Sequence, residues 1–199
     1  MDVTTSKHGL EVFRAVAHLH FEHINQGFLS SLGIPFLTLL YEAIDENKES
    51  VLIVEKVGGK VIGFVSGTAG LGPIYKQLLL RLHRLVWALF PSILSPSKIY
   101  KILEILLINR SDKLLTDLPR QELLSIVVNP THQGQGHAEK LFLSLCEHFK
   151  DSNVTEFRIL VGGSLSRAHA FYTKLGSIPV AEIEVHKGQT SVIYIKRCN

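Results

Sequence analysis

Apolar and polar residues follow one another along this chain in two patterns, one typical of strands and the other of helices. Residues 123–128 are apolar except for Ser125, as expected for a central strand that is buried on both faces. In residues 138–149 the apolar positions recur at intervals of three and four, which predicts a helix with one apolar face. Further strands are predicted at residues 51–55, 61–65, 156–161, 178–185 and 190–196, and further helices at residues 36–44 and 166–175. This succession predicts an α/β fold with a mixed sheet.

Turn-forming residues mark where several of these elements begin and end. The Gly-Gly pair at residues 58–59 joins two strands and predicts a tight hairpin, and a second hairpin is expected around residues 187–189. Pro35 lies at the first turn of one predicted helix, and Gly176 lies at the C-terminal end of another. Residues 11–20 are mixed, and we interpret them as a strand followed by a helix.

Residues 74–108 form an apolar insertion between the third and fourth predicted strands. Residues 74–90 predict one long helix that Pro91 stops, and residues 98–107 predict a second helix. The longest uncharged run in this segment, residues 85–97, contains two prolines and is shorter than the about 20 apolar residues that cross a bilayer. We therefore predict no transmembrane segment. The insertion is expected to pack on the sheet, on a second copy of the chain in a homodimer, or on a membrane surface as a peripheral basic amphipathic face.

Size and composition are those of an ordinary globular protein. The 199 residues predict a single domain, residues 1–199. The net charge of +3 is small and the lysines and arginines are scattered, so nucleic acid is not an expected partner. The sequence lacks the ligand spacing of a metal site, and we expect no metal. The first ten residues lack a secretory apolar core and the two cysteines indicate no disulfide framework, so we expect the cytoplasm.

The segment between the strand at residues 123–128 and the helix at residues 138–149 is the clearest candidate for a binding site. It reads Gln133-Gly134-Gln135-Gly136-His137-Ala138. Glycine lets the backbone turn sharply and approach a ligand, and the helix that follows offers unpaired N–H groups and the positive end of its dipole. This arrangement is typical of a diphosphate site. A dinucleotide fingerprint would need a third glycine where the chain has Glu139, and a nucleoside-triphosphate loop would need a Lys-Ser or Lys-Thr pair that does not follow.

Two segments of the chain resemble motifs of one enzyme family. Gln133, Gly136 and Ala138 fit Gln-x-x-Gly-x-Ala, which resembles the cofactor loop Arg/Gln-x-x-Gly-x-Gly/Ala of the GNAT superfamily, the acetyl-CoA-dependent N-acetyltransferases. Residues 168–176 resemble the family's Ala-x-x-(Phe/Leu)-Tyr-x-Lys-x-Gly segment. The resemblance covers roughly residues 120–198. It implies a GNAT-like mixed, mostly antiparallel sheet flanked by helices, with the insertion between strands 3 and 4.

The same resemblance implies acetyl-CoA as co-substrate and a set of residues that bind it. In the family the fourth strand parts from the fifth, and its free amides receive the cofactor arm. The family often has Asn where this chain has Leu165, so we expect a neighbouring serine to cap the helix and Ser164 to contact the cofactor. The predicted cofactor-binding residues are Ile126, Val127, Val128, Gln133, Gly134, Gln135, Gly136, His137, Ala138, Ser164 and Tyr172.

Acetyl transfer from a thioester to an amine requires a donor to the developing oxyanion, an acid for the thiolate and a base for the amine. The amides of residues 126–128 are candidate oxyanion donors. Tyr172 corresponds to a family tyrosine that points at the sulfur. Full proton transfer from a phenol to a thiolate is uphill by about 2 kcal/mol, so we expect a hydrogen bond with late transfer. Glu122 lies close to where the family carries a water-linked glutamate and is the candidate base, although a strand-edge carboxylate is also commonly only solvated.

The functional hypothesis is therefore an N-acetyltransferase that acts on a primary amine of a small molecule. Because no Ser-His pair is evident and Cys146 is expected in the core, we predict direct attack in a ternary complex rather than a covalent acyl-enzyme. Two alternatives remain open: a catalytically inactive CoA-binding module, and an acetyltransferase of protein N-termini or lysines. The acceptor is expected to contact residues 27–33, residues 36–41 and the insertion, none of which carries a motif that identifies it.

Overall fold

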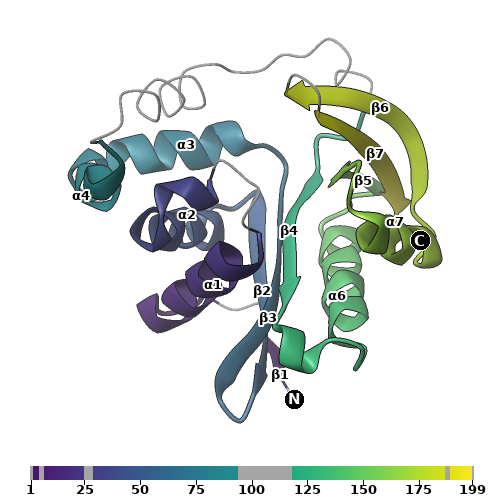
Figure 1. Ribbon diagram of the computed structural model, residues 1–199, viewed down its shortest axis with the longest axis horizontal. Helices are drawn as coiled ribbons and strands as arrows, with labels where there is room; N and C mark the ends of the chain where they lie inside the picture. Colours follow the sequence, from purple (N-terminus) through teal and green to yellow (C-terminus); the bar gives the residue numbers. More distant parts are fainter. Residues whose placement is uncertain (1, 5–6, 25–28, 94–117, 187–188, 199) are drawn as a thin grey trace.

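The computed structural model contains one seven-stranded sheet with helices on both faces (Figure 1). It describes residues 2–4, 7–24, 29–93, 118–186 and 189–198. The strands are β1 (Asp2–Thr4), β2 (Ser50–Val57), β3 (Lys60–Thr68), β4 (Glu122–Val128), β5 (Glu156–Gly162), β6 (Ile178–His186) and β7 (Gln189–Arg197). Their order in the sheet is β1-β2-β3-β4-β5-β7-β6, and every neighbouring pair is antiparallel except β4 with β5. The predicted α/β class with a mixed, mostly antiparallel sheet is confirmed.

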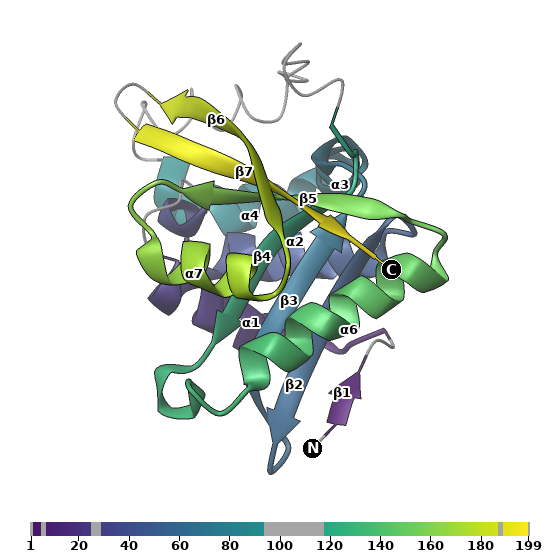
Figure 2. The same cartoon turned by 90° about the vertical axis from the view of Figure 1, so that its right-hand side faces the viewer.

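Helices α1 and α2 cover one face of the sheet, and α6 and α7 cover the other (Figures 1 and 2). The helices are α1 (Leu10–His23), α2 (Ile34–Glu46), α3 (Leu71–Leu80), α4 (Leu82–Ile93), α6 (His137–Asp151) and α7 (Ser166–Lys174), with short 3-10 turns η1 (Ser30–Leu32) and η3 (Pro130–His132). The predicted helices at residues 36–44, 138–149 and 166–175 are confirmed to within a few residues.

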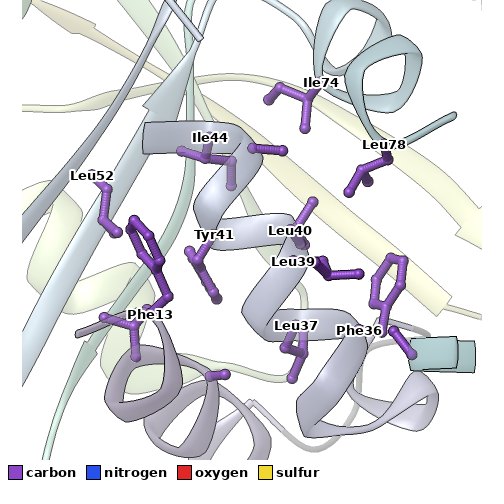
Figure 3. Close-up of a cluster of buried hydrophobic side chains, with 14 of the residues drawn as sticks. Phe13, Phe36, Leu37, Leu39, Leu40, Tyr41, Ile44, Leu52, Ile74 and Leu78 are labelled. Atoms are coloured by element: carbon purple, nitrogen blue, oxygen red, sulfur yellow. The ribbon is translucent and has the colours of Figure 1, made fainter. Parts of the chain in front are cut away.

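The hydrophobic core has two parts, one on each side of the sheet. On the α1–α2 side, Phe13, Phe36 and Leu40 pack with Ile74 and Leu78 of α3 around the second helix (Figure 3). On the other side, the apolar face of α6 packs against β5 and against Tyr172 of α7. The alternation of apolar residues in the chain therefore decides which face of each element is buried.

The N-terminal region differs from the sequence prediction. Residues 11–20 lie entirely within helix α1, so the strand predicted at their start is wrong. Phe13, Val16, Ala17 and His20 are buried together, because their spacing of three and four places them on one helix face. A short edge strand that the sequence did not predict, β1, pairs with β2 instead.

The insertion begins with two helices where the sequence predicted one. Helix α3 ends at Leu80 and α4 begins at Leu82, with Arg81 between them, and α4 continues through Pro91 to Ile93. Arg81 forms ion pairs with Glu42 and Glu46 of α2, and these contacts hold the junction in place. The predicted helix at residues 98–107 lies outside the described residues. Among the helices that the structure describes, none is long and apolar enough to cross a membrane.

Candidate active site

Strands β4 and β5 pair over a short distance and then part. The parallel register joins Glu122 to Arg158 and Leu123 to Ile159, and no later residue of β4 pairs with the described part of β5. From there β5 turns away from β4 (Figure 2). The two strands therefore form a wedge that is closed at Leu123 and open at Val128.

The amide groups of alternate β4 residues point into this wedge. The N–H of Asn129 donates to Ile62 O of β3 at 2.8 Å, so Asn129 directs its amide toward β3. Because amide direction alternates along an antiparallel pair, Ile126 and Val128 direct theirs to the opposite side, into the wedge, while Val127 faces β3. A buried amide needs a partner, and a ligand in the wedge would provide one.

The loop after β4 is held to the end of the strand by its own side chains. Gln133 Nε2 donates to Val128 O at 3.0 Å, which connects the loop directly to the mouth of the wedge. The Asn129 side chain accepts a hydrogen bond from the N–H of Thr131 at 3.0 Å and so stabilises the turn η3. Gln133, a predicted cofactor-binding residue, thus also has a structural contact.

The two glycines of this loop are required by backbone conformation. Gly134 has a φ of +76° and Gly136 a φ of +84°. A Cβ atom at either position would meet nothing within 4 Å, so space does not demand glycine there. The positive φ demands glycine at both positions, because residues with a side chain rarely adopt this conformation.

Helix α6 begins directly after Gly136 and points free amides at the same place. Its first intrahelical bond runs from the N–H of Lys140 to Gly136 O at 3.0 Å, so the amides of His137, Ala138 and Glu139 have no acceptor within their own helix. Gly136, as N-cap, has no side chain to satisfy them. Together with the positive end of the helix dipole, these amides form an anion site next to the mouth of the wedge.

The His137 side chain is directed toward the sheet. It is buried, and its Nδ1 lies 3.1 Å from Oε1 of Glu55 on β2. Lys140 Nζ approaches the same oxygen at 2.9 Å. Glu55 was not among the predicted site residues. The sequence does contain a signal for Glu55, because this acid directly follows four apolar strand residues and a charge in such a strand needs a partner.

Tyr172 is buried on α7 among other aromatic rings. It is 5% exposed, and its ring centroid lies 5.8 Å from that of Phe142 on α6 and 6.3 Å from that of Tyr194 on β7. Burial raises the pKa of Tyr172 above its ordinary value, so its hydroxyl stays protonated at neutral pH. The sequence-predicted acid thus lies next to the helix that begins at the loop.

His169, which the sequence did not single out, fixes the orientation of α7. Its Nε2 lies 3.1 Å from Gly162 O at the end of β5, and its Nδ1 lies 2.8 Å from the Tyr194 hydroxyl. A carbonyl only accepts, so Nε2 donates to Gly162 O. The His169 ring therefore joins α7 to β5 and β7.

The expected serine cap of α7 is wrong. Leu165 is the N-cap residue and makes no side-chain capping bond. Instead, the backbone closes the turn, because the N–H of Leu165 donates to Gly162 O at 2.9 Å and that of His169 donates to Leu165 O at 3.1 Å. Ser164 is exposed in this turn.

Glu122, the candidate base, lies at the closed end of the wedge in an ion pair. Its Oε2 accepts hydrogen bonds from Nε of Arg158 at 2.9 Å and from Nη2 at 2.8 Å, and each side chain is 20% exposed. Burial, and after it the charge of Glu122, raise the pKa of Tyr75 on α3 to about 12. The insertion therefore approaches the same end of β4.

The predicted site residues fall into two groups. The strand end and the loop are joined by the bond between Gln133 and Val128, and Tyr172 connects to them through α6. Glu122 lies at the opposite end of β4. A wedge lined by amides, with an anion site at its mouth, fits a long ligand that carries a diphosphate at one end.

Comparison with known proteins identifies the family. The model described as the Acetyltransferase (GNAT) family matches residues 20–177, most of the chain. The chain belongs to the GNAT family. It is accordingly an acyltransferase, and acetyl-CoA is its co-substrate. No curated protein sequence matches this GNAT protein significantly.

Solved structures with the same fold include several acetyltransferases. An N-acetyltransferase from Staphylococcus aureus Mu50 has a TM-score of 0.63 at 12% identity, with 100% of both chains covered. An aminoglycoside 6'-N-acetyltransferase complexed with coenzyme A has a TM-score of 0.61 at 11% identity, covering 100% of this chain and 98% of that one. The ribosomal-protein-S18-alanine N-acetyltransferase from Escherichia coli has a TM-score of 0.59 at 13% identity, covering 100% and 95%. At these identities the likeness shows the fold alone.

Proposed function

We propose that this GNAT protein transfers the acetyl group of acetyl-CoA to a primary amine of a small molecule, by direct attack in a ternary complex. The wedge between β4 and β5, with the uncapped start of α6 at its mouth, is the observation that carries the proposal. Two structures of the same fold are aminoglycoside 6'-acetyltransferases, which supports a small amine as the acceptor class.

The loop and the wedge divide the binding of acetyl-CoA between them. The amides of the loop and of residues 137–139 hold the diphosphate. The amide groups of Ile126 and Val128 pair with the pantetheine arm, and one of their N–H groups donates to the thioester oxygen as negative charge develops there. Because these donors are fixed by the sheet, they need no rearrangement during the reaction.

Tyr172 stabilises the departing thiolate by a hydrogen bond. Burial raises the pKa of this phenol above its ordinary value, which makes complete proton transfer to a thiolate less favourable than it is in water. The hydroxyl nevertheless remains a donor at neutral pH. A hydrogen bond that strengthens as the C–S bond breaks lowers the barrier without that transfer.

Glu122 accepts the proton of the amine through water. Arg158 binds its Oε2, and we assign the water contact to the other carboxylate oxygen. Glu122→Gln should lower kcat/KM by at least about 100-fold. The same substitution at Glu147, an exposed residue of α6, is the matched control. An unchanged kcat/KM in Glu122→Gln would exclude this carboxylate as the base.

A covalent acetyl-enzyme on Cys146 is disfavoured by the state of its thiol. Burial raises the pKa of Cys146 to about 12, so almost none of it is thiolate at neutral pH. Direct transfer needs no such nucleophile, and it predicts sequential rather than ping-pong kinetics.

Two measurements test the function as a whole. Titration calorimetry with CoA measures binding, and thiol release from acetyl-CoA is followed with a panel of amino sugars, polyamines and aminoglycosides. If the protein binds CoA but releases no thiol from acetyl-CoA with any of these acceptors, the result would favour a catalytically inactive CoA-binding module. Release with N-terminal or lysine peptides but with no small amine would favour a protein acetyltransferase, the second candidate, since the Escherichia coli S18-alanine enzyme has the same fold.

A further inference from the structure

A buried carboxylate lies beneath the first turn of α6. Glu55 of β2 is 0% exposed, and its Oε1 contacts Nδ1 of His137 at 3.1 Å and Nζ of Lys140 at 2.9 Å. His137 and Lys140 are three residues apart and therefore lie on one face of the helix. Both contacts act on the turn whose amides form the anion site.

This contact is a buried side-chain anchor at the start of the helix. Gly136 adopts a left-handed conformation as N-cap and makes no side-chain capping bond. Gly63, the β3 partner of Glu55, lets α6 approach the sheet: a Cβ there would lie 2.9 Å from Val127 O and 3.2 Å from Leu141 Cδ1 of α6. The close approach brings the first turn within reach of a carboxylate on the strand beyond.

The cluster is not arranged for stability alone. Oε2 of Glu55 and Nε2 of His137 are both buried without a hydrogen-bond partner among the described residues. Unsatisfied buried polar atoms are unfavourable, and an apolar side chain at position 55 would remove the unpaired Oε2. A buried acid kept in this condition calls for a role besides packing.

We propose that Glu55 is a positioning residue for acetyl-CoA: through His137 and Lys140 it holds the first turn of α6 so that its amides point at the diphosphate. This inference rests on the proposed diphosphate site. The competing role is direct contact of Lys140, which is 42% exposed, with a phosphate. The two roles predict opposite effects of Glu55→Gln on the affinity for CoA. Positioning by Glu55 predicts weaker binding, whereas a direct phosphate contact predicts tighter binding because Lys140 would no longer be paired with Glu55.

Glu55→Gln and Lys140→Gln test the proposal, with Lys150→Gln at the far end of α6 as a matched charge control. Calorimetry with CoA should show about tenfold weaker binding for each of the first two, since each loses a charge-assisted hydrogen bond. The double variant should be hardly weaker than either single one. KM for acetyl-CoA should rise with kcat nearly unchanged, and hydrogen exchange should quicken at the amide of Lys140, whose N–H closes the first turn on Gly136 O.

Equal or tighter CoA binding by folded Glu55→Gln would overturn the proposal, as would additive effects in the double variant. Lys140→Gln retains the buried acid and lies at the surface, so it remains informative if Glu55→Gln does not fold. Unchanged CoA affinity in Lys140→Gln would also overturn the proposal. Failure of the wild-type protein to bind CoA would overturn the proposed function itself, a result distinct from these.

Discussion

At the scale of single residues, Gly136 connects backbone conformation to ligand charge. Its φ of +84° is strained for most side chains, yet a Cβ would meet no atom within 4 Å. Asn tolerates this conformation better than most residues, and Asp has the same shape with a negative charge. Comparison of Gly136→Asn with Gly136→Asp therefore separates the effect of backbone strain on CoA binding from the effect of negative charge.

Gly136→Asp should abolish measurable CoA binding, because the carboxylate would lie against the diphosphate and the uncapped amides. Gly136→Asn should bind CoA more weakly than the wild type but measurably. Titration calorimetry with both variants measures the difference. Micromolar binding by Gly136→Asp would contradict the position given to the diphosphate.

Tyr172→Phe tests the role of a single hydroxyl. The ring remains packed against Phe142 and Tyr194, so the free energy of unfolding should change little. The kcat for thiol release should fall by about 10- to 100-fold, with a smaller change in KM, because the hydrogen bond forms mainly in the transition state. A variant with wild-type kcat would show that the leaving thiolate needs no help from this residue.

At the scale of elements, ion pairs attach the insertion to α2. Arg84 forms a bidentate pair with Glu42, at 2.9 and 2.7 Å, and Arg81 contacts Glu42 at 3.1 Å. The break between α3 and α4 occurs at Arg81, so the direction of α4 depends on this carboxylate. The insertion also brings Tyr75 near Glu122, which connects its position to the site.

Glu42→Gln should lower the free energy of unfolding by about 1–2 kcal/mol. The effect is moderate because the Arg84 side chain is 38% exposed and solvent screens the pair. Urea unfolding at low and high salt measures it, and the difference from wild type should shrink at high salt. Glu147→Gln, at an exposed position of α6, should show no such difference.

At the scale of the whole molecule, a buried hydrogen-bond network joins α1 and α2 to the central strand. His20 Nδ1 lies 2.6 Å from the Tyr41 hydroxyl, and Tyr41 also hydrogen-bonds with Ser125 of β4. Burial lowers the pKa of His20 from 6.5 to about 4, so the side chain is neutral in the folded protein at physiological pH. Protonation of this group therefore opposes folding.

The sign of the pH dependence follows from this shift. Between pH 6.5 and about 4 the unfolded chain binds a proton at His20 that the folded protein does not. The free energy of unfolding therefore falls as the pH drops through this window, by about 3 kcal/mol from His20. His20→Asn should show a correspondingly shallower decline in urea unfolding at a series of pH values, whereas equal slopes would contradict a neutral buried histidine.

The sequence determined those features that depend on neighbouring residues. The glycine loop, the helices α6 and α7, the first hairpin and the paired strands β6 and β7 follow from turn residues and short periodic patterns, and their boundaries were predicted closely. The family resemblance also came from two short motifs, and the family match agrees with it. Residues 11–20 were misread because a short mixed segment fits a strand or a helix until it packs.

The tertiary structure alone decided contacts between residues far apart in the chain. Glu55 meets Lys140 across 85 positions, and Arg81 meets Glu46 across 35, so no local pattern could indicate either pair. Contacts between distant residues also decide the break at Arg81, the role of His169 and the ion pair of Glu122 with Arg158. Local conformation depends on the energetics of adjacent residues, whereas the partner of a buried charge is known only when the sheet and helices have packed.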